Sequence, residues 1–275
     1  MSDAPFAAVT GWPASHSLSP AIMASWLRET GLQGRYGVLE IPPERLARGV
    51  RAAAAMGMAG LNVTLPHKTA ALALADEVSP AARAVGAANL LTFDHDRRIL
   101  ADNTDVVGVA AALSADRPAA PAVLIGAGGA ARAALHHLAA QDRPLRIVNR
   151  TRARAERLAA EFAVTAEIFT DSDADALRGA GLIINATSLG MAGQPALDPD
   201  LSVCATGALA FDMVYAPLNT AFLTAARRAG HETADGLTML IGQARPSFQA
   251  FFGAAAPPRD EGVRQTLLDR LEMRP

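Results

Sequence analysis

The stretch "AVLIGAGGAARAALHHLAA" (residues 122–140) joins an apolar run, a glycine turn and a helical pattern. Its turn reads Gly126-x-Gly128-x-x-Ala131 between a strand and a helix, the context that a dinucleotide-binding fingerprint requires. Gly126 permits the tight turn, Gly128 lets the backbone approach a pyrophosphate, and the helix N-terminus faces the anion. An alanine-rich chain can also produce this spacing by chance, but the flanking strand and helix favour dinucleotide binding. The cofactor contacts expected in this turn are Gly126, Ala127, Gly128, Gly129 and Ala130.

The next expected strand (145–150) ends without the acidic residue that usually binds the ribose hydroxyls of NAD. Asn149 takes that position, and Arg150, Thr151 and Arg154 follow at the strand end and in the first helical turn. Arginine forks match phosphate oxygens, and threonine adds a hydroxyl. A 2′-phosphate, and hence NADP, is the predicted ligand. The alternative is a solvated basic helix face, which explains the other two arginines of this helix better than Arg150 and Arg154.

Strand and helix patterns alternate along the chain and predict an α/β fold. Residues 181–186 and 208–213 are continuous apolar runs, typical of parallel strands buried on both faces. With the strands on either side of the glycine turn, they predict a doubly wound parallel sheet of the Rossmann type. A Pro-rich link (116–122) precedes this sheet, and the pattern after Gly236 is purely helical.

The first hundred residues predict a second, mixed α/β sheet. Strands are expected at 6–11 and 35–41, and a hairpin is expected between 88–93 and 97–102. The C-terminal helices have no strand of their own, so we expect them to pack on this first block. The predicted domains are residues 1–102 for substrate binding and catalysis, 103–236 for NADP, and 237–275 as C-terminal helices returning to the substrate domain.

Polar residues follow the first strand. "SHSLSP" places Ser17 and Ser19 two positions apart, and alternate residues of an extended segment point the same way, so both hydroxyls could bind one ligand carboxylate. Ser19 followed by Pro20 also predicts a helix start, with Ser19 at the N-cap and Pro20 at the first helical position. For Ser19 taken alone, capping is the favoured alternative.

The stretch "NVTLPHK" (62–68) alternates polar and apolar residues and stops at a proline. Its polar side carries Asn62 and Thr64, and Lys68 stands at the start of the next helix. A cation there is unfavourable against the helix dipole, and such local conflicts are typical of functional positions. For Asn62 the alternative is a hydrogen bond to nearby backbone.

Two further polar groups follow, the second of them at the junction of the two expected domains. Asn89 begins a strand, and "DNTD" (102–105) ends on Asp105. The alternative for the second group is a polar turn that caps a helix, where Asp and Thr are common. Spacing does not show whether Lys68 and Asp105 meet.

Composition excludes several classes of function. A net charge of −2 gives no electrostatic basis for binding nucleic acid or an anionic membrane. The single cysteine, Cys204, excludes an internal disulfide and fits a cytoplasmic setting. The N-terminus lacks the features of a signal peptide, and no run approaches the roughly 20 apolar residues that span a bilayer. The six histidines show no metal-binding spacing, so no metal is expected.

Nine short stretches, in order along the chain, give it a resemblance to the shikimate dehydrogenase family. They are "GWPASHSLSP", "LNVTLPHK", "GAANLL", "DNTD", "IGAGGAARA", "NRT", "INATSLGM", "FDMVY" and "ADGLTMLIGQA". The resemblance implies a substrate domain paired with a Rossmann-type domain. It also implies reversible, NADP-dependent oxidation of shikimate to 3-dehydroshikimate in aromatic amino acid biosynthesis.

The resemblance also implies roles for individual residues. Lys68 and Asp105 are the expected catalytic pair, and which of them holds the proton at each step stays open. The expected substrate contacts are Ser17, Ser19 and Tyr215 at the carboxylate and Thr64, Lys68, Asn89, Asp105 and Gln243 at the hydroxyls. The expected cofactor contacts outside the glycine turn are Asn149, Arg150, Thr151, Arg154, Thr187, Met213 and Gly236.

The chain departs from the family pattern at a few positions. Val106 stands where a glycine is frequent, and Leu90 replaces a usual threonine. Arg245 and Pro246 enter the last site helix, and Pro246 should kink it by removing a backbone donor, which affects the direction of Gln243 one turn earlier.

Two alternatives to the shikimate assignment stay open. One is a quinate/shikimate dehydrogenase paralogue with broader substrate or cofactor use, and the other is a non-catalytic dinucleotide or metabolite sensor. The retained Lys68 and Asp105 argue against a sensor, which has no need of a proton-transfer pair. The expected partner is the small-molecule substrate, and the protein is expected to be a monomer or a homodimer.

Overall fold

The computed structural model describes residues 4–113, 120–171 and 173–273 of the 275-residue chain. It divides into two compact units. Unit 1 comprises Met1–Asp105 and Gln243–Pro275, and unit 2 comprises Val106–Gly242. The divisions therefore fall at 105/106 and 242/243, where the sequence placed them at 102/103 and 236/237. The expected Pro-rich link lies mostly outside the described residues.

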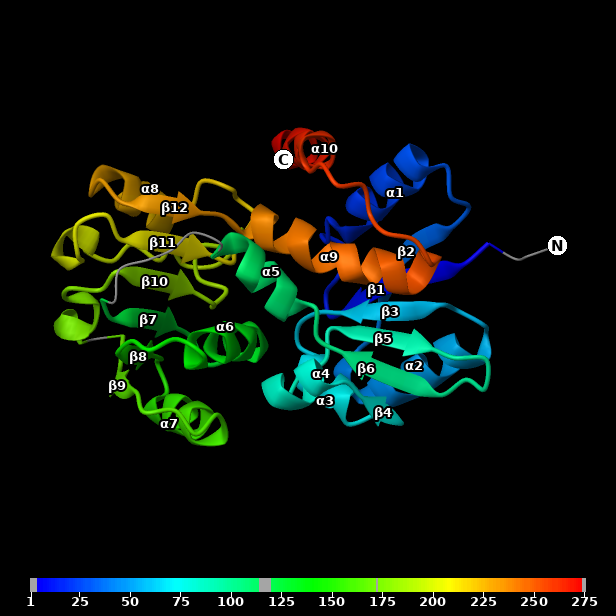
Figure 1. Cartoon of the computed structure of the whole chain (residues 1–275), viewed down its shortest axis with the longest axis horizontal. Coiled ribbons are helices and arrows are strands. Elements are labelled where there is room, and N and C mark those ends of the chain that lie inside the picture. The colour runs from blue at the N-terminus through cyan, green and yellow to red at the C-terminus, as the bar shows by residue number, and fades with distance from the viewer. Residues whose placement is uncertain (1–3, 114–119, 172, 274–275) are drawn as a thin grey trace. The chain divides into compact units, whose positions relative to one another are not determined.

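Unit 1 contains a six-stranded sheet and the helices that pack on it (Figure 1). Its strands are β1 (Phe6–Gly11), β2 (Arg35–Glu40), β3 (Gly60–Val63), β4 (Glu77–Val78), β5 (Leu90–Phe93) and β6 (Ile99–Asp102). Its helices are α1 (Ser19–Thr30), η1 (Pro43–Arg45), α2 (Leu46–Ala55), α3 (Lys68–Leu72), α4 (Pro80–Val85), the larger part of α9 (Gly236–Phe252) and α10 (Glu261–Glu272).

The sheet of unit 1 is mixed, as predicted. Its strand order is β2-β1-β3-β5-β6-β4, and β5 runs antiparallel to both β3 and β6. The register brings Thr10 beside Val63 and Asn62 beside Leu90, so the ends of β1 and β3 and the start of β5 lie at one edge of the sheet. The polar residues that follow these strands are thereby collected at that edge.

The C-terminal helices return to unit 1, which confirms the expectation from their lack of strands. The ring of Phe248 on α9 meets Trp26 of α1 edge-on, with 5.6 Å between ring centroids. Phe251 packs so closely on β3 that a Cβ at Gly60 would lie 2.6 Å from its ring. Glycine at position 60 therefore allows α9 to approach the sheet that carries the polar residues.

Unit 2 contains a six-stranded sheet in which every strand is parallel to its neighbours (Figure 1). Its strands are β7 (Ala122–Ile125), β8 (Leu145–Val148), β9 (Glu167–Phe169), β10 (Leu182–Asn185), β11 (Leu209–Asp212) and β12 (Glu232–Ala234). Its helices are α5 (Asp105–Ala112), α6 (Gly129–Ala139), α7 (Arg152–Glu161), η2 (Ala174–Leu177), η3 (Leu201–Val203), α8 (Ala221–Arg228) and the first turns of α9.

The order β12-β11-β10-β7-β8-β9 is that of a doubly wound sheet, which confirms the predicted Rossmann-type domain. Successive residues of β7 pack into two different cores: Leu124 faces the α6 side, and Val123 faces the α8 side. The continuous apolar runs of the sequence therefore mark strands that are buried on both faces. The topological switch lies between β7 and β10, next to the glycine turn.

The start of α1 differs from the prediction. Leu18, in a helical conformation, takes the N-cap position, and Ser19 is the first helical residue. The segment from Ser17 to Ser19 is therefore not extended, so the alternation argument for these hydroxyls was wrong. The short strands β4, β9 and β12 have only two or three residues each, too few for the hydrophobic period to reveal.

Among the described residues, none of the helices is both long enough and apolar enough to cross a bilayer.

Candidate active site

Lys68 and Asp105 form an ion pair in unit 1. The Nζ atom of Lys68, at the start of α3, lies 2.6 Å from Oδ2 of Asp105, the first residue of α5. The Asp105 side chain is 0% exposed and that of Lys68 12%. The structure thus joins two residues that are 37 positions apart in the sequence. Asp105 therefore does more than cap a helix in a polar turn, the alternative interpretation of "DNTD". A nearly buried ammonium held by one carboxylate is suited to moving a proton.

Lys68 is the only lysine of the chain, which otherwise uses arginine for its basic side chains. Guanidinium keeps its proton in proteins, whereas a lysine ammonium can release one when its surroundings favour the neutral form. Among the described ion pairs, only this one contains a fully buried carboxylate, that of Asp105. Its cation is the lysine at the start of α3, the one basic side chain here that can release a proton.

Asn89 connects the second oxygen of Asp105 to two other polar groups. Its Nδ2 donates to Oδ1 of Asp105 at 3.0 Å, to Oγ1 of Thr104 at 3.0 Å and to Oε1 of Gln243 at 3.3 Å. Its Oδ1 accepts from the backbone N–H of Thr104 at 2.7 Å. Because that N–H can only donate, the orientation of the Asn89 amide is defined.

The side chain of Gln243 therefore points at Asn89. With Oε1 accepting from Asn89, the two Nε2 donors of Gln243 have no partner among the described residues. They are available to an incoming hydroxyl or carbonyl oxygen.

Thr64 follows β3 and is fixed by its backbone. Its N–H donates to the carbonyl of Thr10 at 2.8 Å. A Cβ at Gly11 would lie 2.5 Å from the Thr64 methyl and 2.9 Å from the carbonyl of Leu65. Only glycine at position 11 allows the chain after β3 to approach the end of β1 this closely.

The loop that carries Ser17 is attached to β2 through Glu40. One Glu40 oxygen, Oε1, accepts the N–H groups of Ala14 and Ser15, each at 2.7 Å. These bonds, that from Ala14 first, hold the pKa of Glu40 below its ordinary value. Oγ of Ser17 in turn accepts the N–H of Ser19, the first residue of α1, at 3.2 Å.

We expect Glu40→Ala to weaken binding of the ligand carboxylate expected at Ser17 and to raise the KM for that ligand roughly 3- to 10-fold, because the loop of Ser17 loses two bonds to one charged acceptor. Turnover should change little. Because the pKa of Glu40 is lowered, its stabilisation of the loop is fully present at pH values above the ordinary glutamate pKa. That stabilisation is lost as the pH falls through the lowered pKa. Steady-state kinetics against pH would show an acid-side rise in KM in the parent protein and not in the variant. Glu44→Ala is the control, and an unchanged KM in Glu40→Ala would refute the role.

The glycine turn of unit 2 fits a dinucleotide phosphate. Gly126 has φ +113°, which side chains rarely adopt, and a Cβ there would lie 2.9 Å from the Thr187 methyl. A Cβ at Gly128 would meet nothing within 4 Å, so the space in front of α6 is open. The first N–H groups of α6, from Gly129 and Ala130, begin at this space. An anion there would be stabilised by these donors and by the helix dipole.

The basic residues after β8 fall into two groups. Arg152 pairs with Glu156 at 2.9 Å and donates to the carbonyl of Ile168 at 3.0 Å, so it belongs to the helix surface. Arg150 and Arg154 are exposed, and their side chains have no ion-pair or hydrogen-bond partner among the described residues. Free guanidinium groups beside the end of β8 fit a 2′-phosphate.

Asn149 does not stand free beside these arginines, because its Nδ2 donates to the carbonyl of Thr151 at 2.8 Å. The amide thereby holds the turn from β8 into α7, at whose N-cap Thr151 stands.

Thr187 and Met213 follow two neighbouring strands and share a buried polar network. Oγ1 of Thr187 donates to Oδ1 of Asn185 at 2.7 Å, and Nδ2 of Asn185 donates to Oδ1 of Asp212 at 2.9 Å. Oδ1 of Asp212 also accepts the N–H of Val214 at 3.0 Å. Burial raises the pKa of the Asp212 carboxyl. The network ties together the loops that follow β10 and β11.

Gly236 and Tyr215 lie near the second of these loops. A Cβ at Gly236 would lie 2.5 Å from the carbonyl oxygen of Met213 and 2.7 Å from that of Val214. Glycine is therefore required where α9 begins against this loop. Tyr215 is partly buried, three residues after the end of β11.

Comparison with known proteins identifies the family. Residues 9–91 match the family model described as the shikimate dehydrogenase substrate binding domain, and residues 109–192 match that described as shikimate / quinate 5-dehydrogenase. The shikimate dehydrogenase (NADP(+)) of Paracoccus denitrificans is 45% identical over 272 residues, 96% of each chain. The chain belongs to the shikimate dehydrogenase family.

Solved structures agree with this membership. The chain resembles shikimate 5-dehydrogenase from Thermus thermophilus in complex with NADP(H) and shikimate, with 35% identity, a TM-score of 0.82, and coverage of 95% of this chain and 99% of that one. It also resembles quinate dehydrogenase from Corynebacterium glutamicum in complex with NAD, with 28% identity, a TM-score of 0.85, and coverage of 97% and 99%. These comparisons confirm the predicted function, that of an NADP-dependent shikimate dehydrogenase, which is an oxidoreductase.

Sequence reasoning missed several polar residues that shape the candidate site. Asn62 bonds the carbonyl of Asn89, as its backbone alternative predicted, but it also bonds Tyr36 and Ser247. The sequence did not mark Tyr36, Glu40 and Ser247 as site residues, because single polar residues are common on the exposed faces of strands and helices. Asn185 and Asp212 did carry one: each is a polar residue that ends an otherwise apolar, buried strand.

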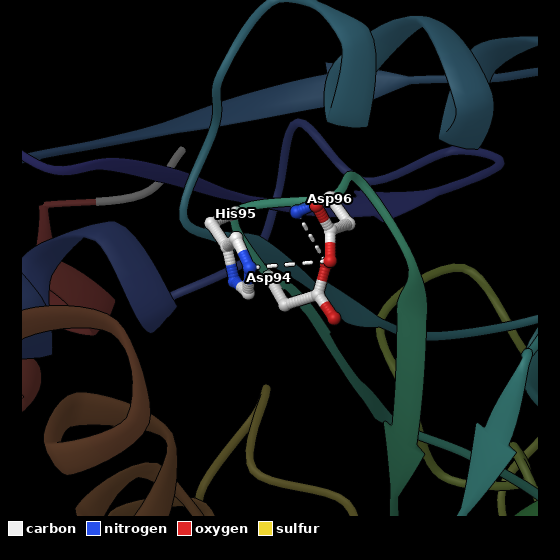
Figure 2. A group of neighbouring side chains, drawn as sticks. All are labelled: Asp94, His95 and Asp96. Atoms are coloured by element: carbon white, nitrogen blue, oxygen red, sulfur yellow. Dashed lines mark hydrogen bonds and ion pairs between the residues drawn. The ribbon is translucent and has the colours of Figure 1, made fainter.

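One side-chain group outside these sites has the composition of a metal centre. Asp94, His95 and Asp96 lie together in the β5–β6 turn (Figure 2). Oδ1 of Asp94 accepts the N–H groups of Asp96 and Arg98, each at 2.9 Å, and so shapes the turn. His95 is 88% exposed. These bonds explain the cluster as the polar turn of the predicted hairpin.

Proposed function

We propose that Lys68 and Asp105 transfer the proton in the reversible, NADP-dependent oxidation of shikimate to 3-dehydroshikimate. The observation that carries the proposal is the 2.6 Å ion pair of a nearly buried lysine with a fully buried aspartate. Asn89 binds the other oxygen of that aspartate, which holds the carboxylate in one orientation. The fold, the two family matches and the names of the relatives support the same reaction.

The proton step follows from the chemistry of the pair. When bound, the nicotinamide donates or accepts the hydride at the carbinol carbon. In reduction, Lys68 Nζ donates a proton to the oxygen that becomes the 3-hydroxyl, and Asp105 stabilises the ammonium beforehand. In oxidation the same oxygen returns its proton to the pair, which requires that Lys68 be neutral or that Asp105 accept. The two residues are therefore assigned the proton step jointly.

The remaining polar residues of unit 1 bind the substrate in this proposal. The proposed contacts of its hydroxyls are Thr64, Lys68, Asn89, Asp105 and Gln243. Ser17 and Ser19 are the proposed donors to its carboxylate, together with Tyr215 of unit 2. The free Nε2 donors of Gln243 and the hydrogen bond between Ser17 and Ser19 support these roles.

The cofactor contacts are proposed for unit 2. They are Gly126, Ala127, Gly128, Gly129 and Ala130 at the phosphates, Asn149, Arg150, Thr151 and Arg154 at the 2′-phosphate, and Thr187, Met213 and Gly236 at the nicotinamide end. The open space at Gly128 and the unpaired guanidinium groups support the first two sets.

The finer organisation of the protein belongs to the same proposal. Unit 1 is the proposed substrate part, and unit 2 is the proposed NADP part. We further propose a cytoplasmic protein, with which the single cysteine agrees, acting as a monomer or a homodimer.

The likeness to a quinate dehydrogenase favours quinate as the second candidate substrate. Steady-state rates with shikimate and with quinate, each with NADP and with NAD, separate the two. We expect the highest kcat/KM with shikimate and NADP. A higher value with quinate and NAD would replace the proposed substrate and cofactor, and no nicotinamide reduction in any pair would refute catalysis.

A further inference from the structure

The helix α9 contains a proline next to the residues of the site. Pro246 has no N–H, so the carbonyl of Gly242, four residues earlier, lacks its usual helical donor. Gly242 directly precedes Gln243. The helix is thus weakened where it must present the Gln243 amide.

Ser247, which follows the proline, is fully buried and makes two hydrogen bonds. Its Oγ accepts from Nδ2 of Asn62 on β3 at 2.8 Å and donates to the carbonyl of Gln243 at 3.3 Å. The second bond reaches the turn that carries Gln243, and the first anchors that turn to the sheet.

Asn62 is held by partners that define its orientation. Its Oδ1 accepts the hydroxyl proton of Tyr36 at 2.7 Å, and its Nδ2 also donates to the carbonyl of Asn89 at 3.3 Å. A backbone carbonyl can only accept, so reversing the amide of Asn62 would place its Oδ1 against the Asn89 carbonyl and lose that hydrogen bond. The Nδ2 atom is therefore directed at Ser247.

These bonds close a ring around the site. Asn62 binds Ser247, Ser247 binds the Gln243 backbone, the Gln243 side chain binds Asn89, and the Asn89 backbone binds Asn62. We propose that Ser247 and Asn62 are positioning residues that aim Gln243 at the substrate hydroxyls, in place of the helical bond that Pro246 removes. The inference rests on the proposed role of Gln243 as a substrate contact.

The test is Ser247→Ala, which keeps the helix because alanine has the highest helix propensity. We expect the KM for shikimate to rise roughly 2- to 5-fold, the effect of one neutral hydrogen bond, with kcat and the KM for NADP nearly unchanged. Thr266→Ala is the matched control, because it removes a helical hydroxyl that bonds its own i−4 carbonyl at 3.0 Å, away from the site. An unchanged KM in Ser247→Ala would overturn the inference.

A double-mutant cycle separates positioning from a general loss of stability. In a Gln243→Ala background, adding Ser247→Ala should leave the KM for shikimate unchanged, because the group that Ser247 positions is gone. Effects that multiply would overturn the inference, since they would show that Ser247 acts independently of Gln243. Asn62→Ala should raise the KM for shikimate in the parent protein. In the Asn62→Ala background, adding Ser247→Ala should cause no further rise.

The failures of the two proposals are distinguishable. If Gln243→Ala alone leaves the KM for shikimate unchanged, the proposed substrate contact is wrong and the inference falls with it. If Gln243→Ala raises KM while Ser247→Ala does not, the contact stands and only the positioning role is refuted.

Discussion

Replacing Lys68 by alanine should lower turnover roughly 10²- to 10⁴-fold, the usual range for an acid–base group, with a smaller change in substrate binding. The ammonium that moves the proton is lost, and the chain has no second lysine that could replace it. The measurement is kcat in both reaction directions together with the dissociation constant of shikimate. Turnover at the parent level would remove Lys68 from the chemistry.

Lys68→Arg controls for the charge. Alanine leaves the fully buried Asp105 without its cation, which by itself costs stability. Arginine keeps a cation beside Asp105 but does not release its proton. We therefore expect Lys68→Arg to fold with the thermal stability of the parent and to lose turnover nearly as severely as Lys68→Ala. A Lys68→Arg protein with near-normal turnover would show that charge alone suffices there.

Replacing Arg150 and Arg154 together by alanine should raise the KM for NADP by roughly two orders of magnitude, because each charge-assisted hydrogen bond to the 2′-phosphate is worth about 1.5–3 kcal/mol and solvent weakens both. The KM for NAD, which has no 2′-phosphate, should stay nearly constant. Both arginines are exposed and unpaired among the described residues, so their removal leaves no buried partner behind.

Arg157→Ala is the matched control for this cofactor prediction. It removes an exposed arginine from the same helix, α7, one turn further from the end of β8. We expect it to leave both cofactors unaffected. Equal losses for NADP and NAD in the double variant would contradict the 2′-phosphate assignment, and an effect of Arg157→Ala on NADP alone would extend the phosphate site along the helix.

Local signals were strong enough to predict the cofactor half of the protein. The glycine turn, the apolar strands and the arginines after β8 lie within short windows, and each has a conformation or charge that few alternatives share. The structure adds that Arg152 is paired with Glu156 whereas Arg150 and Arg154 are not, a division that the sequence suggested but spacing could not test.

The start of α1 shows where local reasoning failed. A serine before a proline predicts a capped helix start, yet Leu18 occupies the N-cap and the hydroxyl of Ser17 accepts the N–H of Ser19. The loop conformation is set by Glu40, 25 positions further on, which binds the N–H of Ser15. Propensity at one residue gave way to a tertiary contact, as it commonly does at helix ends.

By itself the sequence determined the fold class and the position of the dinucleotide turn, and through the family resemblance it supplied the candidate list that contains Lys68, Asp105, Asn89 and Gln243. Only the tertiary structure decided that these four meet, and that Asn62, Tyr36 and Ser247 hold them. Periodicity and turn chemistry are properties of neighbours along the chain, so they can be read locally. Hydrogen bonds between residues up to 185 positions apart depend on strand register and helix packing, which no local pattern encodes.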